Sequence, residues 1–168
     1  MKKNPKMTRL LSDHPLAELT DEDIPPSLRR VKEKGWSYTP NGSRVLTGLI
    51  PKATPPYVEV LQEETWINGR GMPCHDLPRA ESERTGPLLR RCFAYAFACL
   101  VEAERRFGDQ EVLAYVILSL GGLDDDLLTA TVTFCTRDPN TKPYIFDIEN
   151  VRDAAVAELT VSDRDMGR

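Results

Sequence analysis

The chain has 168 residues and a formal net charge of −4 at pH 7, from 26 acidic and 22 basic side chains. This length suffices for one domain that buries about 70% of its unfolded surface, so the fold needs no disulfides. The first nine residues hold three lysines, one arginine and no acid, so the rest of the chain carries −4 − 4 = −8. Such an acidic body repels nucleic acid and anionic membranes and suits a basic protein partner.

The cysteines and the start of the chain indicate the cellular compartment. The four cysteines show no CxxC spacing, and three lie in segments with a helix or strand pattern, so we expect reduced thiols. The basic start lacks the continuous apolar stretch of a signal sequence, and no later run approaches membrane-spanning length. These features predict a soluble cytoplasmic protein.

The first segment of the chain reads as irregular. Residues 1–23 are polar, contain prolines and show no periodicity, which predicts a mobile N-terminal arm. Pro25 and Pro26 suit the first turn of a short helix, where proline needs no amide donor. Gly35 suits its end. We expect this helix to lie on the surface of a single domain over residues 24–160.

A hairpin, a strand and a long loop are expected next. Residues 36–50 contain Asn41 and Gly42 between two strand-like runs, the strongest short-range signal of a β-hairpin. Residues 57–67 alternate apolar and polar side chains, which favours a strand, with a helix as the weaker option. Residues 68–86 are rich in glycine, proline and charge. A loop of this length is the first place to expect a functional site.

The central helix is the clearest local prediction and covers residues 87–107. Pro87 suits the first helical position after an N-cap at Thr85 or Gly86. Gly108 suits a left-handed cap at the other end. Apolar side chains surround the middle of this helix nearly completely, so the rest of the fold must cover it on several sides.

The last third of the chain alternates strands with turns. Residues 111–119 are apolar on both faces, as in a buried central strand, and residues 127–136 alternate apolar side chains with threonines. Residues 144–148 resemble another strand, residues 150–159 a helix with an N-cap signal, and residues 161–168 a polar tail. We therefore predict a single α+β domain, with a mostly antiparallel sheet of about five or six strands packed against one long central helix, plus short N- and C-terminal helices.

Candidate chemistry gathers in the loop over residues 68–86. Cys74, His75 and Asp76 combine a nucleophile, a base and a carboxylate, which would suit a cysteine-dependent enzyme. However, neighbouring side chains in an extended chain point to opposite sides, which argues against a shared active site. Arg70 lies in a glycine-rich run that lacks a phosphate-binding pattern, and no spacing supports zinc. We expect no metal and no cofactor.

An acidic turn is the other candidate site. Asp124, Asp125 and Asp126 follow two glycines and are most simply a solvated hairpin turn. Three consecutive carboxylates do not match the alternating ligands of a divalent cation. A protruding acidic turn can instead accept basic side chains of a partner and speed association. The outward threonines of the following strand would extend this partner-binding surface: Thr129, Thr131 and Thr133.

Three classes of function remain open. A protein-binding module needs a stable scaffold and a charged surface, and both are visible in the sequence. The small size, the acidic body and the small number of candidate catalytic residues are similar to those of bacterial immunity or antitoxin proteins. Such proteins act as inhibitors of a basic toxin. We therefore expect a non-enzymatic protein that binds a basic partner protein. A nucleic-acid-associated protein using residues Arg70 to Arg91, or an enzyme using Cys74 and His75, is the alternative.

Overall fold

The computed structural model describes residues 1–16, 18–53, 56–120 and 127–167. Within these ranges, a five-stranded antiparallel main sheet has the order β1 (Lys2–Lys3), β7 (Ala155–Leu159), β5 (Val112–Leu120), β6 (Leu128–Thr136) and β4 (Arg70–Gly71). A small sheet in the same ranges pairs β2 (Trp36–Tyr38) with β3 (Arg44–Leu46). The helices are α1 (Pro5–Asp13), α2 (Pro26–Lys34), α3 (Val60–Asn68) and α4 (Glu81–Phe107). The 3-10 turns are η1 (Asp21–Asp23), η2 (Thr47–Leu49), η3 (Ile148–Asn150) and η4 (Val161–Gly167).

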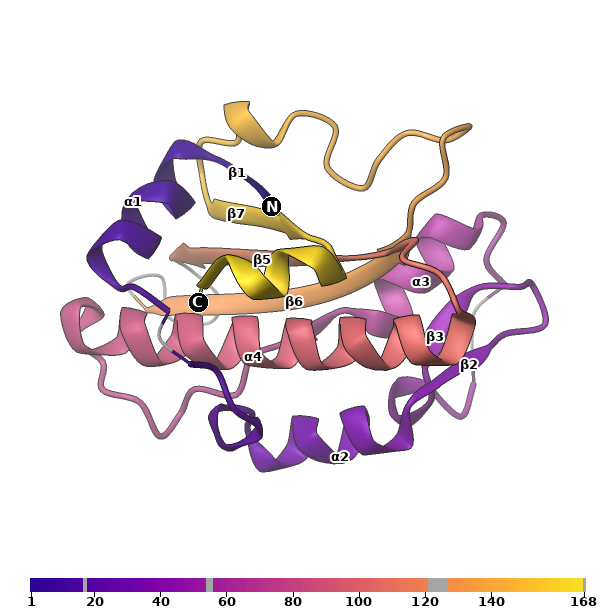
Figure 1. Cartoon of the computed structure of the whole chain (residues 1–168), viewed down its shortest axis with the longest axis horizontal. Coiled ribbons are helices and arrows are strands. Elements are labelled where there is room, and N and C mark those ends of the chain that lie inside the picture. Colours follow the sequence, from indigo (N-terminus) through magenta and orange to yellow (C-terminus); the bar gives the residue numbers. More distant parts are fainter. Residues whose placement is uncertain (17, 54–55, 121–126, 168) are drawn as a thin grey trace.

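The main sheet separates two apolar cores. α4 lies along one face, and residues 137–154 pass over the other (Figure 1). Alternate residues of the two central strands face α4: Val112, Ala114, Val116, Leu118, Leu128, Ala130, Val132 and Phe134. A smaller core fills the opposite face: Leu113, Tyr115, Cys135, Ile148 and Val156. The predicted α+β class, with one long helix on an antiparallel sheet, is confirmed.

The long helix begins earlier than predicted. α4 starts at Glu81, so the predicted start at Pro87 with an N-cap at Thr85 or Gly86 is wrong. Pro87 lies inside the helix and removes one of its backbone hydrogen bonds. The added turns are anchored by the buried Arg84, whose Nε donates to a backbone oxygen at the start of β6 at 2.7 Å. This long-range contact has no local sequence signal.

The predicted hairpin is confirmed, and so are the predicted C-terminal ends of two helices, at Gly35 and Gly108. Trp36 of β2 lies opposite Leu46 of β3, and Gly42 has a positive φ of 83° in the turn between them. The Trp36 indole is buried and donates to Cys99 O at 3.0 Å, which fixes the hairpin against α4. Gly108 ends α4 with the predicted left-handed conformation.

The N-terminal segment is more ordered than the sequence suggests. The prediction of an irregular arm over residues 1–23 is wrong for the part that forms β1 and α1. The Asn4 side chain is buried and bonds four backbone groups: Met7 N, Val156 N, Val151 O and Ala154 O. It caps α1 and joins it to β7 at the same time. The first residues are therefore part of the sheet.

Three further local predictions are wrong. Residues 57–67 contain helix α3 instead of the favoured strand. The described residues 144–148 form bends and the start of η3, and no strand. Residues 150–159 end in strand β7 instead of forming a helix, because β5 and β1 pair with it on its two sides. Sheet pairing here outweighs the local helix pattern.

We predict that Asn4→Ala lowers the free energy of unfolding by about 2–4 kcal/mol, because it leaves buried backbone groups of α1 and β7 without partners. Urea denaturation followed by circular dichroism measures this change. Ser12→Ala, at an exposed position of α1, is the control and should cost less than about 0.5 kcal/mol. Equal stability of the two variants would contradict the proposed link between α1 and β7.

Candidate functional site

Helix α3 buries three polar side chains and exposes two apolar ones. Glu63, Glu64 and Asn68 are buried. Val60 and Trp66 expose 43% and 52% of their surfaces. A helix on the surface of a domain ordinarily shows the reverse pattern, with its apolar side chains inward. The inner and the outer side of α3 therefore each need a physical explanation.

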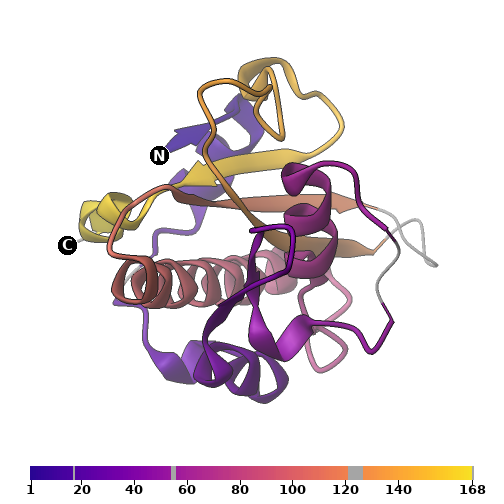
Figure 2. The same cartoon turned by 90° about the vertical axis from the view of Figure 1, so that its right-hand side faces the viewer.

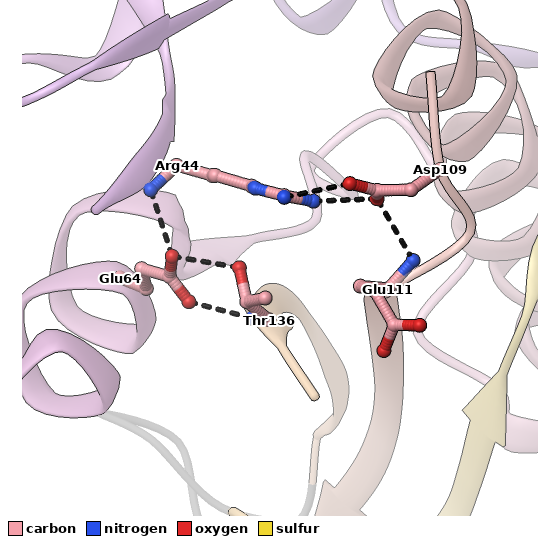
Figure 3. A network of polar contacts seen from close by, with 5 residues as sticks. All are labelled: Arg44, Glu64, Asp109, Glu111 and Thr136. Atoms are coloured by element: carbon pink, nitrogen blue, oxygen red, sulfur yellow. Dashed lines mark hydrogen bonds and ion pairs between the residues drawn. The ribbon is translucent and has the colours of Figure 1, made fainter. Parts of the chain in front are cut away.

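On the inner side, Glu64 links the two sheets (Figure 3). Its carboxylate accepts from the amide of Arg44 at 2.7 Å, and from the amide and hydroxyl of Thr136 at 2.6 and 2.8 Å. Arg44 belongs to β3 and Thr136 to β6. Burial raises the pKa of Glu64 above its usual value, although these hydrogen bonds oppose the rise.

Asn68 repeats the link one helical turn further along. Its Oδ1 accepts from Leu46 N at 2.9 Å. Its Nδ2 donates to Arg44 O at 3.0 Å and to Phe134 O at 3.1 Å. Residues four apart on a helix rise by about 6 Å, close to the roughly 6.6 Å between alternate residues of a strand. Glu64 and Asn68 thus occupy the place of a strand between β3 and β6.

Arg44 fixes the same region to the end of α4. Its guanidinium donates to both carboxylate oxygens of Asp109, at 2.6 and 2.7 Å, and lies 4.6 Å from the centroid of the Phe107 ring. Asp109 also accepts from the amide of Glu111 at 3.1 Å (Figure 3). The hydrogen bonds between Arg44 and Asp109 lower the pKa of Asp109 and raise that of Arg44. The backbone under α3 is therefore held from several sides.

Four apolar residues in α3 or just before it form what we name the α3 apolar surface: Tyr57, Val58, Val60 and Trp66. Val58 exposes 94% of its surface, and the rings of Tyr57 and Trp66 pack with their centroids 5.6 Å apart. Figure 2 views the molecule from the end at which α3 lies. Apolar residues grouped on a surface mark interaction sites more often than scattered ones do.

The sequence prediction missed this surface. A strand over residues 57–67 would place Val58, Val60 and Trp66 within a sheet, where their apolar character needs no further explanation. The signal that could have found the surface is the spacing of the polar residues. Read as a helix, the stretch places its buried acids and Asn68 on one side and Trp66 on the other.

The predicted partner-binding residues are only partly available to a partner. Asp124, Asp125 and Asp126 lie outside the described residues. Among the threonines of β6, Thr131 is exposed and Thr129 is half-buried, donating to Ser119 O at 3.3 Å. Thr133 is 1% exposed, because α3 covers it and Thr65 O accepts its hydroxyl at 3.0 Å. The predicted threonine surface therefore shrinks by one residue.

Four arginines of the predicted basic region are engaged within the fold. Arg70 donates to two backbone oxygens, at 2.6 and 3.3 Å. Arg84 is buried, and Arg90 and Arg91 each form two hydrogen bonds with an aspartate. Their charge is poorly available to a phosphate backbone, which weakens the case for nucleic acid.

Two of the candidate catalytic residues of the loop, Cys74 and Asp76, bind different arginines of α4. The Cys74 sulfur accepts from Arg84 Nη2 at 2.9 Å, and His75 is exposed. Asp76 accepts two hydrogen bonds from Arg91, which hold the pKa of Asp76 well below its usual value. Among the described residues, no hydrogen bond joins the Cys74 thiol to His75. The loop is thus organised by arginines of α4.

The remaining titratable groups offer little further chemistry. Among the described residues, no group of three or more His, Cys, Asp or Glu side chains is placed to hold a metal ion. Cys92, Cys99 and Cys135 are buried, and burial raises the pKa of Cys135 to about 12. Within the described ranges, no helix is long and apolar enough to cross a bilayer.

A groove of about 930 Å³ lies along the outer side of α4. Its apolar lining includes Phe97 and Val101, with leucines of the segment that follows α1. Charged side chains at its rim pair with one another: Lys32 with Asp21 at 2.7 Å, and Arg105 with Glu102 at 2.7 Å. Each of these two pairs is neutral as a whole.

The buried carboxyl of Glu64 should make stability depend on pH. Its raised pKa means that, above pH 4.5, the folded chain holds a proton that the unfolded chain has released. The free energy of unfolding therefore falls as pH rises from 4.5 to the pKa of the folded state. We predict that Glu64→Gln removes this slope, measured by urea denaturation at several pH values.

Glu59→Gln, at an exposed position just before α3, is the matched control and should keep the slope. The aspartates with lowered pKa values add a slope of opposite sign that fades above about pH 5, and Glu64→Gln leaves that contribution unchanged. An unchanged slope in Glu64→Gln, or a Glu64 carboxyl that titrates at or below pH 4.5 by NMR, would contradict the prediction.

Comparison of the chain with protein-family models, with curated proteins and with solved structures gives no match. Any function must therefore follow from the chain's own geometry. Most polar contacts described above serve to hold elements together. The α3 apolar surface differs, because the stability of the fold does not require Val58 or Trp66 to be apolar where they face solvent.

Proposed function

We propose that this protein is a non-enzymatic protein-binding module whose partner docks on the α3 apolar surface. The observation that supports the proposal is the exposure of Val58, Val60 and Trp66, at 94%, 43% and 52%. Tryptophan and tyrosine contribute more than most residues to binding energy, and here Trp66 packs against Tyr57. Covering these side chains would remove apolar surface from water, which favours association.

The backbone beneath this surface is ordered before a partner arrives. Glu63 accepts from Thr39 Oγ1 at 2.9 Å and from Ser43 Oγ at 2.5 Å, which ties α3 to the hairpin loop. Glu64 and Asn68 add the links to β3 and β6 described above. A surface that is already held loses little conformational entropy on binding, so its contacts contribute more fully to affinity.

The partner is proposed to be a basic protein. The chain beyond residue 9 carries −4 − 4 = −8, and Glu59 is exposed beside the apolar residues. Opposite charge speeds the encounter of two proteins and disfavours partners of the wrong sign. An inhibitor of the immunity or antitoxin type, which covers the site of a basic toxin, would combine this charge with an apolar docking surface.

We predict that Val58→Ser combined with Trp66→Ser weakens partner binding by at least about 30-fold, because a tryptophan at the centre of an interface contributes roughly 2 kcal/mol or more. The partner is first captured with the wild-type chain from its native host, after nuclease treatment, and identified by mass spectrometry. Its affinity for each variant is then measured by titration calorimetry.

Phe146→Ser is the matched control, since Phe146 is apolar and 82% exposed but belongs to the segment between β6 and η3 and not to α3. Urea denaturation confirms that both proteins remain folded. Equal affinity of the Val58/Trp66 variant and the wild type would remove the α3 apolar surface from the interface. An equal loss of affinity in the control variant would show that the effect is not specific to the α3 apolar surface.

A second test concerns the acidic turn. Replacing Asp124, Asp125 and Asp126 with asparagine removes three negative charges, so we expect association with a basic partner to slow several-fold at low salt. The difference should shrink as salt is raised, because screening weakens long-range attraction. Stopped-flow measurement of the association rate checks this. An unchanged rate would exclude the turn from the encounter.

A further inference from the structure

The groove beside α4 is lined by segments that lie far apart in the sequence. Its floor is the outer side of α4, and Leu16 and Leu19 of the segment before η1 line part of its wall. The first residues of the protein and η4 line another part, and both ends of the protein lie on the side of α4 away from α2 (Figure 1). Sites for small ligands have volumes of about 300–1,000 Å³ and mostly apolar linings with a few polar groups. The groove volume of about 930 Å³ falls within this range.

Small side chains leave room along the floor of the groove. Ala94 and Ala98 lie one helical turn apart on the same side of α4, and Val101 follows on that side. Ala98 and Val101 are half-buried, so the fold covers this part of α4 only in part. The lining extends from Phe93 to Arg105, over which the helix rises by about 18 Å. The floor is therefore long enough for an extended alkyl chain.

The part of the wall formed by the two ends of the protein is positively charged. Its charged groups are the Met1 amino group, Lys3, Asp163 and Arg164, with a net charge of +2. The Met1 amino group binds Asp163, so these two groups are neutral as a pair. Within the described part of the chain, neither Lys3 nor Arg164 forms an ion pair. Their two positive charges are available to a ligand.

The other charged groups of the lining have a net charge of −1: Glu18, Asp21, Lys32, Glu102 and Arg105. The pairs of Lys32 with Asp21 and of Arg105 with Glu102 are neutral, so the remaining charge is that of Glu18. A negatively charged group of a ligand is therefore attracted to the wall at the two ends of the protein.

We propose that this groove binds a long-chain carboxylate. Its alkyl chain lies along α4, and its carboxylate lies next to Lys3 and Arg164. Removing the methylene groups from water supplies most of the affinity, and the two cations set the orientation. This inference is independent of the proposed protein-binding function, because the groove shares no residue with the α3 apolar surface.

The first test is titration calorimetry of the full-length protein with octanoate, decanoate and dodecanoate, each below its micelle-forming concentration. We expect one saturable site and an affinity that rises at least about tenfold from octanoate to dodecanoate, because each fully buried methylene contributes roughly fourfold. An absence of saturable binding of dodecanoate, or an affinity that does not rise with the length of the alkyl chain, would overturn the proposal.

A variant that fills the groove locates the site. Ala98→Trp places a large side chain on the floor and should weaken dodecanoate binding at least about tenfold, because it takes the volume of the alkyl chain. Ala80→Trp is the matched control, since Ala80 is exposed and does not line the groove. Circular dichroism confirms that both variants are folded. Unchanged binding in Ala98→Trp would overturn the proposal.

Light scattering on the same proteins tests the other possible occupant of the groove. A wild-type dimer that Ala98→Trp converts to a monomer would show that a second copy of the protein covers the groove, and would overturn the proposal. We expect the wild type and Ala98→Trp to have the same mass.

The charge of the ligand is tested without filling the groove. The wild type should bind dodecanoate more tightly than dodecyltrimethylammonium. Lys3→Gln combined with Arg164→Gln should weaken dodecanoate binding about threefold or more, because each exposed cation contributes modestly. Lys6→Gln combined with Arg30→Gln removes two exposed charges outside the groove and should leave it unchanged. Equal binding of the two amphiphiles by the wild type, or equal effects of the two double variants, would overturn the assigned orientation.

Discussion

The fold depends on two polar side chains that act in place of a strand. β3 and β6 belong to different sheets, and each presents backbone donors and acceptors on the side that faces the other. Glu64 and Asn68 satisfy these groups on both strands, and the rise of one helical turn matches the spacing of alternate strand residues. Left unpaired in the interior, each such group would cost about 1–3 kcal/mol.

This constraint also decides what α3 shows to solvent. A helix that must direct Glu63, Glu64 and Asn68 inward has no freedom to turn Trp66 into the core, because the same rotation would pull the polar links out of register. The exposure of Trp66 and the burial of these three polar side chains therefore follow from one orientation of the helix. A single short helix in this way joins the two sheets and carries the proposed docking surface.

The sequence is informative where the local pattern and the tertiary pairing agree. β5 and β6 follow from their apolar runs and their alternation, and the end of α4 from Gly108. The sequence is misleading where contacts between distant residues determine the secondary structure. Residues 150–159 carry a helix pattern but complete the sheet, and Asn4 has a role only because β7 lies beside it. The α3 apolar surface was hidden because the apolar alternation of residues 57–67 favours a strand and so conceals the helical spacing of the buried polar residues.

The pairing of β1 with β7 has a consequence for synthesis on the ribosome. Asn4 and its partner Val156 are 152 positions apart, so at about 5–20 residues per second they are made roughly 8–30 s apart. Throughout that interval the apolar side of α1 has no β7 to pack on, and β5 has a free edge open to other strands. β1 and β7 can join the sheet only after β7 has been translated. A chain that stalls before residue 155 would therefore remain in this aggregation-prone state.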